Sequence, residues 1–302
     1  MKLSLKDITK SFDKKTVLKG ISFDVQSGQV FGLLGRNGAG KTTTIRIIMQ
    51  FFHADGGQVT INGKDLKDSK VRFGYMPEER GLYPKIKIFD QLVYLGELSG
   101  QDKTTVKENV YSLLKKVKLE SYANKKLKVL SKGNQQKIQL VATLVSDPDI
   151  IILDEPFSGL DPVNSILLED IIREEIDKGK IVMFSGHQLN YIEKCCDDVA
   201  IINDGKIVLS GNINKIKDEY SRDMIDIRTS EYGSLGELLQ HSNYVSSFEN
   251  NEENFKVKLK NEIMKKDLFF EIANQNIDVD NFSVHRPDLN DIFVEYTKEI
   301  NE

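Results

Sequence analysis

The sequence predicts an α/β protein in which a parallel sheet, covered by helices on both faces, is followed by a small α+β module. Short apolar runs typical of buried strands alternate with segments of helical periodicity, which predicts the larger part. A glycine-rich turn joins one of these strands to one of these helices. The pattern changes near Gly211, so we expect one domain over residues 1–215 and a second over residues 223–302.

The first part of the chain is expected to contain strands and one helix. Apolar residues between Leu3 and Val25, separated by turn residues, predict strands. The run Gln29–Leu34 predicts a short apolar strand, and Lys41–Met49 follows the glycine-rich loop with the spacing of a helix. Residues 59–61, closed by Asn62-Gly63, are typical of a hairpin strand.

The middle of the chain is expected to alternate between helix and strand. Residues 88–119 carry apolar side chains at helical spacing. The runs 150–153 and 181–184 are typical of buried parallel strands. Between them a helix is expected to begin after Asp161, a good N-cap, and to stop at Gly179.

The last part of the chain predicts a separate small fold. Residues 212–222 are polar and are expected to form a linker. Strands are then expected at 223–228, 245–248, 255–259 and 279–284, helices at 235–240 and 264–273, and a final amphipathic helix from Leu289 to Tyr296. This order is typical of a ferredoxin-like module. His241 and His285 have no partner at ligand spacing, so we expect surface or structural roles for both.

Composition narrows the function classes. The chain has 302 residues and a net charge of -4, from 42 basic and 46 acidic residues, which argues against a nucleic-acid partner. No apolar run is long enough for a transmembrane helix, and the N-terminal residues lack the apolar stretch of a signal peptide. We therefore expect a cytoplasmic protein.

A phosphate-binding motif lies in the glycine-rich turn. The motif residues are Gly35, Arg36, Asn37, Gly38, Ala39, Gly40, Lys41 and Thr42, and we include Thr43 in the expected nucleotide site. Glycines let backbone N–H groups turn inward around phosphate oxygens, and the following helix directs its positive end at them. Lys41 is expected to reach the β- and γ-phosphates of ATP, and the Thr42 hydroxyl to bind Mg²⁺. The alternative is a chance glycine turn, and the position of the motif between a predicted strand and a predicted helix favours phosphate binding over it.

Two acids follow the apolar run 150–153. Asp154, at the end of the predicted strand, is placed to hold Mg²⁺ through water, and Glu155 to orient the attacking water. Acids often follow strands because loops are polar, so this pair alone is only moderately specific.

Further motifs give the chain a family resemblance. Leu130-Ser131-Lys132-Gly133-Asn134-Gln135 precedes Asp154-Glu155-Pro156, Ser158-Gly159-Leu160-Asp161-Pro162 and Ser185-Gly186-His187. In this order they resemble the ATP-binding domain of ABC transporters over residues 1 to about 215. The family fold is a P-loop NTPase with an antiparallel β subdomain and a helical subdomain. The stretch from Gly74 to Pro84, and the C-terminal module, resemble bacterial sodium-efflux and multidrug-efflux ATPases.

The resemblance implies a head-to-tail dimer with two ATP molecules between the subunits. Ser131 and Gly133 would contact the γ-phosphate held by the other subunit, although a plain helix cap would use the same residues. His187 would contact the γ-phosphate and hold the water with Glu155, and Asp161 would lie at the dimer seam. Phe12 would stack on adenine, or equally serve as a core residue at a strand end.

Three positions in two motifs depart from the family pattern. Lys132 and Asn134 replace the usual Gly and Gln, and Glu78 replaces the glutamine that senses Mg²⁺ and the membrane partner. Glutamate can still ligate a hard cation, so Glu78 joins Thr42 and Asp154 as an expected metal residue.

The implied function is an ATPase that powers an exporter of an ion such as sodium, a drug or another small solute. Its partners would be an integral membrane permease and a second ATPase, either another copy or a sister chain, at the inner face of the cell membrane. The alternative is a soluble regulatory or non-transport ABC ATPase. Translation-type relatives usually carry two ATPase domains, and repair-type ones a long coiled coil, whereas this chain has one P-loop and no room for the coil.

Overall fold

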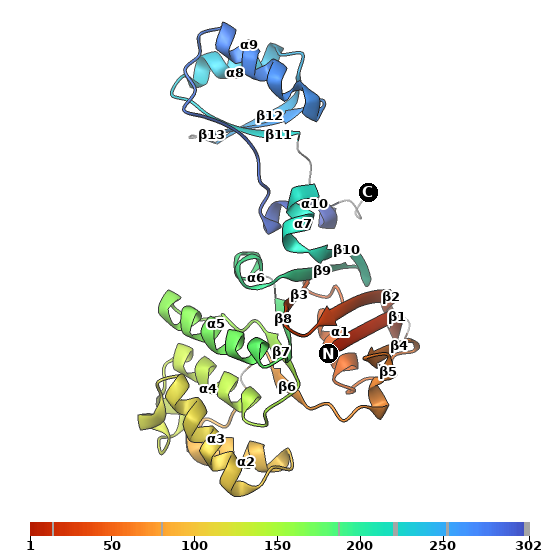
Figure 1. The fold of residues 1–302 in the computed structure, drawn as a ribbon, viewed down its shortest axis with the longest axis vertical. Helices are drawn as coiled ribbons and strands as arrows, with labels where there is room; N and C mark the ends of the chain where they lie inside the picture. Colours follow the sequence, from red (N-terminus) through yellow and green to blue (C-terminus); the bar gives the residue numbers. More distant parts are fainter. Residues whose placement is uncertain (14, 80, 187, 220–222, 252–253, 299–302) are drawn as a thin grey trace. The chain divides into compact units, whose positions relative to one another are not determined.

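The structure is a computed structural model that describes residues 1–13, 15–79, 81–186, 188–219, 223–251 and 254–298 (Figure 1). The chain divides into two compact units. The first contains Met1–Ile213 and the residues from Phe293 on, and the second contains Asn214–Ile292. Within the described residues, no helix combines the length and apolarity needed to span a membrane.

An antiparallel sheet forms one layer of the first unit. Its strands are β1 (Lys2–Phe12), β2 (Lys15–Gln26), β4 (Gly56–Ile61) and β5 (Lys64–Asp65), in the order β2-β1-β4-β5. Asn62 and Gly63 both have positive φ, 49° and 78°, as the tight hairpin turn between β4 and β5 requires. The expected hairpin at this Asn-Gly pair is therefore confirmed.

A mostly parallel sheet forms the second layer and places the motifs. The strand order is β10 (Lys206–Asn212), β9 (Asp198–Asn203), β3 (Val30–Leu34), β8 (Ile181–Gly186), β7 (Ile150–Asp154) and β6 (Phe73–Met76), with only β10 antiparallel to its neighbour. Leu34 pairs with Gly186, Asp154 with Ser185 and Met76 with Leu153. The ends of β3, β6, β7 and β8 therefore meet at one edge of the sheet.

Helices cover this parallel sheet. One face shares a buried core with β1, β2 and α1 (Lys41–Ile48), in which Phe31 and Leu33 pack with Ile45 and Ile48. Three further helices contact strands of the parallel sheet: α4 (Lys132–Leu144), α5 (Pro162–Asp177) and α6 (Leu189–Cys195). A Cβ at Gly32 would lie 2.8 Å from Ile192 Cγ2 of α6, so only glycine allows this approach. The expected helical stretch 88–119 consists of α2 (Ile88–Leu98) and α3 (Lys103–Lys116) (Figure 1).

The second unit has the expected ferredoxin-like topology. Its elements are β11 (Met224–Arg228), α8 (Tyr232–His241), β12 (Val245–Asn251), β13 (Asn254–Leu259), α9 (Lys265–Asn274) and β14 (Asn281–Val284). The strands form an antiparallel sheet in the order β12-β13-β11-β14. Leu235 and Leu268 from the two helices share one buried core with the sheet. The chain continues into α10 (Leu289–Lys298).

The segment 212–222, which is expected to form a linker, contains a helix. Residues Ile213–Glu219 form the helix α7, while residues 220–222 lie outside the described part of the chain. Ile213 is buried, and its N–H donates to the Asp197 carbonyl at 2.9 Å.

A cluster of ion pairs around the buried Glu175 lies at the C-terminal end of α5 and is expected to stabilise the fold. Glu175 pairs with Lys180 and with Lys178 at 2.6 Å, and Lys180 also pairs with Asp147 at 2.6 Å. Burial alone would raise the pKa of Glu175, but the hydrogen bonds from the two lysines outweigh it and the pKa lies below its ordinary value. A carboxyl group of lowered pKa contributes stability above its unfolded pKa and loses it as the pH falls.

We expect Glu175→Ala to lower the free energy of unfolding by about 2 kcal/mol at pH 7, because Lys180 loses a buried charged partner. Urea denaturation at pH 7 and at pH values below the ordinary pKa of 4.5 measures the effect. The difference from the wild type should shrink in acid, where the carboxyl group becomes protonated. Glu174→Ala, at the exposed neighbour that pairs with Lys116, is the matched control and should change little. Equal losses for the two variants would contradict this account.

Candidate nucleotide-binding site

The loop between β3 and α1 is shaped for a phosphate group. A Cβ at Gly35 would lie 2.5 Å from the Ile202 carbonyl oxygen. Gly40 has φ 121°, and a Cβ there would lie 2.7 Å from Leu18 Cδ2. Both positions therefore require glycine. The N-cap residue of α1 is Gly40, so no capping side chain accepts from the N–H groups of the first turn. These N–H groups can therefore bind an anion.

The Lys41 ammonium group is influenced by the charges of the three acids expected at the site, Glu78, Asp154 and Glu155. Its Nζ donates to the carbonyl oxygens of Gly35 at 2.6 Å and Arg36 at 3.3 Å. Burial lowers the pKa of Lys41, and the negative charges of Asp154, Glu155 and Glu78 act in the opposite direction. The ammonium group at the start of α1 is thus influenced electrostatically by carboxylates that follow two different strands, β6 and β7.

Asp154 and Glu155 lie where β7 ends. Burial raises the pKa of Asp154, and Glu78 adds to this, while Ser185, Lys41 and Tyr75 act against it. Glu155 is buried, has a positive φ of 51°, and donates its N–H to the Ser185 carbonyl at 2.9 Å. A Cβ at Gly186 would lie 2.8 Å from Glu155 Oε1, so the carboxylate lies against the end of β8. His187, the next residue, lies outside the described residues.

Tyr75 is a site residue that the sequence analysis missed. It lies on β6, opposite Ile152 in the β6–β7 register, two residues before the end of β7. Burial, followed by the charge of Asp154, raises the pKa of Tyr75 to about 12, so the phenol keeps its proton at neutral pH. The signal available in the sequence was its place on a strand three residues before Glu78.

Ser131, Gly133 and Asp161 lie at the starts of two helices. Ser131 Oγ accepts from the Asn134 N–H at 3.3 Å and caps α4, and Asp161 Oδ1 accepts from the Asn164 N–H at 2.9 Å and caps α5. A Cβ on Gly133 would lie 3.4 Å from the Gly159 carbonyl oxygen, so the two starts are neighbours. Within the described residues, no hydrogen bond joins these caps to the loop 35–43. The helix cap expected for Asp161 is confirmed, and Ser131 also caps its helix, which was the alternative to a γ-phosphate contact.

Most of the remaining residues expected to contact the nucleotide are exposed. Phe12, at the end of β1, is 40% exposed and outside the buried core. It packs edge-to-face on Phe52, with ring centroids 5.4 Å apart, and Lys10 Nζ lies 5.4 Å from its centroid. In the loop and the first turn of α1, Arg36, Asn37, Gly38 and Thr42 are exposed, Thr43 is half-buried and Ala39 is buried.

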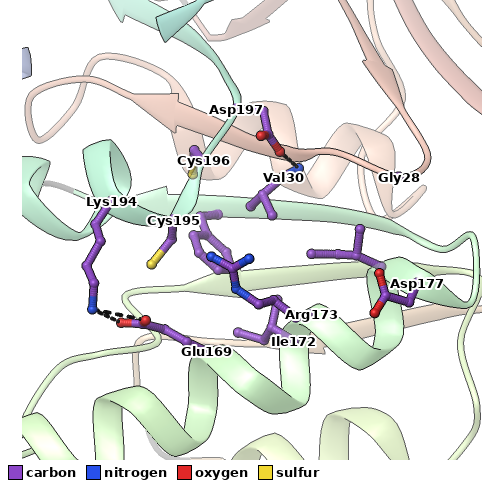
Figure 2. Close-up of a pocket in the computed structure, with 12 residues that line it drawn as sticks. Gly28, Val30, Glu169, Ile172, Arg173, Asp177, Lys194, Cys195, Cys196 and Asp197 are labelled. Carbon is purple, nitrogen blue, oxygen red and sulfur yellow. Dashed lines mark hydrogen bonds and ion pairs between the residues drawn. The ribbon is translucent and has the colours of Figure 1, made fainter. Parts of the chain in front are cut away.

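A cavity of about 310 Å³ lies elsewhere, between α5, α6 and the start of β3 (Figure 2). The cavity lies next to Val30, the first residue of β3, whereas the phosphate loop follows Leu34, the last residue of that strand. Lys194 pairs with Glu169 on its wall at 2.9 Å. Burial and then Glu169 raise the pKa of Cys195 to about 12, so its thiol is no nucleophile at neutral pH. The chemistry of the motifs is therefore not in this cavity.

Comparison with known proteins agrees with these motifs. The family described as "ABC transporter" matches residues 18–158, and the C-terminal domain of "ATP-binding protein DrrA1-3-like" proteins matches residues 211–297. The chain is 35% identical to the uncharacterized ABC transporter ATP-binding protein YhaQ of Bacillus subtilis (strain 168), over 99% of this chain and 100% of that protein.

An export protein and a solved structure are also similar. The Nod factor export ATP-binding protein I of Burkholderia lata is 33% identical to this chain, over 78% of this chain and 80% of that protein. A solved structure described as the ATP binding subunit of an ABC transporter is 30% identical to this chain in sequence, with a TM-score of 0.67. The match covers 73% of this chain and 93% of the chain in that structure. The chain belongs to the ATP-binding proteins of ABC transporters and carries their ATP-hydrolysing domain.

Proposed function

We propose that this chain is the ATP-hydrolysing subunit of an exporter whose channel is formed by a separate integral membrane permease. It works as a head-to-tail pair, with another copy or with a sister ATPase, at the inner face of the membrane. One observation carries the hydrolytic part of the proposal: the strands that precede Glu78, Asp154 and Glu155 end at the same sheet edge as the phosphate loop, and the charges of all three acids act on Lys41. The Nod factor export relative supports the direction of transport.

The phosphate loop and Phe12 hold the nucleotide. The N–H groups of residues 35–43 surround the phosphates, and Lys41 neutralises the β- and γ-phosphates. Binding draws Lys41 Nζ from the carbonyl oxygens of Gly35 and Arg36 to the phosphates. The exposed ring of Phe12 stacks on adenine, and its edge contact with Phe52 fixes its orientation.

The acidic residues fit a magnesium ion that is shared with ATP. Within the described residues, no group of three or more His, Cys, Asp or Glu is placed to hold a metal alone. Mg²⁺ in nucleotide sites takes one or two carboxylates and completes its shell with phosphate oxygens and water. The Thr42 hydroxyl, Asp154 and Glu78 supply such a set. Burial and the charge of Glu78 raise the pKa of Asp154, and a bound cation would favour its charged form. Bound Mg²⁺ would neutralise charge on the transferring phosphoryl group.

Glu155 is the residue that activates water. Its carboxylate accepts a hydrogen bond from the attacking water and orients it toward the γ-phosphorus. The positive φ and the hydrogen bond to Ser185 hold its backbone, so the carboxylate is oriented before ATP binds. We assign His187 a contact with the γ-phosphate on the family pattern alone.

The capped starts of α4 and α5 belong to the site of the other subunit. Ser131 and Gly133 present a helix N-terminus, which favours an anion, and Asp161 lies at the seam between subunits. Binding of ATP then closes the pair, and hydrolysis opens it.

The helical part of the first unit offers the permease contact. Large apolar side chains on and beside α2 and α3 are well exposed, among them Tyr83, Tyr94, Leu98 and Tyr111, at 61%, 56%, 65% and 51%. Apolar residues that gather at a surface mark interaction sites. A permease that docks here senses closure of the ATPase pair.

We expect a tagged Glu155→Gln variant, purified from solubilised membranes with ATP present, to bring a polytopic membrane protein with it in stoichiometric amount. Adding Tyr94→Glu should abolish this co-purification, because it places a charge in the docking surface. Phe51→Glu, at an exposed apolar residue after α1, is the matched control and should leave it intact. Mass spectrometry identifies the partners. A soluble pair alone, or ribosomal or DNA-associated partners, would contradict the transport function.

A further inference from the structure

The helix α4 has a buried polar face. Gln136, Gln139 and Thr143 follow one another at helical spacing and are each no more than 5% exposed. A buried amide or hydroxyl group is costly unless it is hydrogen-bonded. All three side chains donate to backbone carbonyl oxygens. These residues therefore connect α4 to specific segments of backbone.

Gln139 holds the loop that carries Glu78. Its Nε2 donates to the carbonyl oxygens of Pro77 at 2.7 Å and Glu79 at 3.3 Å, on either side of Glu78. The strand before this loop is fixed as well, because a Cβ at Gly74 would lie 2.6 Å from the Thr143 carbonyl oxygen. The loop cannot shift along α4 without breaking both hydrogen bonds of one amide.

Gln136 holds the turn that carries Glu155. Its Nε2 donates to the carbonyl oxygens of Glu155 at 3.3 Å and Pro156 at 3.1 Å. The backbone of Glu155 is left-handed, a conformation that costs a side-chain-bearing residue about 1 kcal/mol. A tertiary hydrogen bond to the carbonyl oxygen helps to keep this conformation.

The geometry points to Gln136 and Gln139 as positioning residues that tie Glu155 and Glu78 to the helix that begins after Ser131. The inference rests on the proposed function, in which the start of α4 meets ATP bound by the other subunit. One rigid helix then contacts two ATP sites: its start contacts the partner's nucleotide, and its amides hold the acids of its own site. Closure over one nucleotide is passed by α4 to the acids around the other.

The first test needs neither nucleotide nor metal. Gln139→Met and Gln136→Met keep a similar length and remove the N–H donors. We expect Gln139→Met to speed hydrogen–deuterium exchange about 10-fold at the backbone amides of residues 78 and 79 only, and Gln136→Met to do so at those of residues 155 and 157 only. Thr143→Val, which removes a hydroxyl from the same helix face, is the control and should leave both segments unchanged. Faster exchange throughout α4 in either variant would show a merely structural role and overturn the inference.

The second test asks whether Gln139 acts through Glu78. We expect Gln139→Met to raise the Mg²⁺ concentration for half-maximal ATPase activity about 10-fold, because residues that orient metal ligands commonly have effects of this size. Glu78→Ala should raise it as well, and the double variant should match Glu78→Ala alone. If Glu78→Ala shifts Mg²⁺ activation and Gln139→Met does not, or if their effects multiply, the positioning role is wrong. If Glu78→Ala has no effect, the proposed magnesium role of Glu78 fails first.

Discussion

Replacing Glu155 with glutamine is expected to lower the maximal rate of ATP hydrolysis about 1,000-fold, the size of effect typical for loss of a general base. Glutamine has the same shape, so the hydrogen bonds of the Glu155 backbone to Ser185 and Gln136 remain. The amide cannot accept a proton from water, while Lys41 and the phosphate loop still bind ATP. Phosphate release at saturating ATP measures the rate, and equilibrium dialysis measures the binding.

The control for this prediction is a neighbouring acid outside the proposed chemistry. Glu79→Gln changes an exposed side chain, and its backbone carbonyl oxygen remains available to Gln139. Its hydrolysis rate should stay near that of the wild type. A Glu155→Gln variant that keeps about a tenth or more of the wild-type rate would mean that another group activates the water.

Placing aspartate at Gly133 is expected to lower ATP hydrolysis about 100-fold, the scale seen when a charge-stabilising contact to a transition state is lost. The carboxylate would face the γ-phosphate that the other subunit holds. The fold should tolerate the change, because a Cβ at Gly133 makes ordinary contacts at 3.4 and 3.6 Å. Acidic residues in the first turn stabilise a helix, so the melting temperature should hold or rise.

Two comparisons make this second prediction specific. Gly133→Ala adds the same Cβ without charge and should hydrolyse ATP far faster than Gly133→Asp. The affinity of Gly133→Asp for ATP, measured at concentrations where the chain is a monomer, should equal that of the wild type, because the phosphate loop is untouched. Weaker binding by the isolated chain would show that Gly133 belongs to the site of its own subunit.

The sequence predicted those parts of the site that depend on local motifs. The phosphate loop and the Asp154-Glu155 pair lie next to strands whose apolar character is plain, so their place at strand ends followed from the chain alone. The parallel pairing then brings these ends together. The ferredoxin-like order of the second unit was predictable for the same reason, because each element has its own periodicity.

Other features depend on contacts between distant residues. Gln136 and Gln139 are ordinary helix residues in the sequence, and only the packing of α4 against β6 and against the segments that follow β6 and β7 makes them buried donors. His285 had no partner at ligand spacing, yet its ring nitrogens lie 2.7 Å from Asp226 Oδ2 and 3.2 Å from Asp291 Oδ2. Asp226 is 59 residues from His285 along the sequence, and local sequence patterns do not predict contacts at such a separation. Both nitrogens face carboxylates, which fits the structural role that was one of the two expectations for His285.

The central claim is that ATP is enclosed between two ATPase subunits, and nucleotide occlusion tests it most directly. The Glu155→Gln variant would be purified with its partners in the presence of ATP and desalted rapidly. Native mass spectrometry would then count subunits and nucleotides in each particle. The account predicts particles that hold two ATPase subunits and two ATP molecules, and loss of the nucleotide when Gly133→Asp is added. Retention of ATP by particles that contain a single ATPase subunit would contradict it.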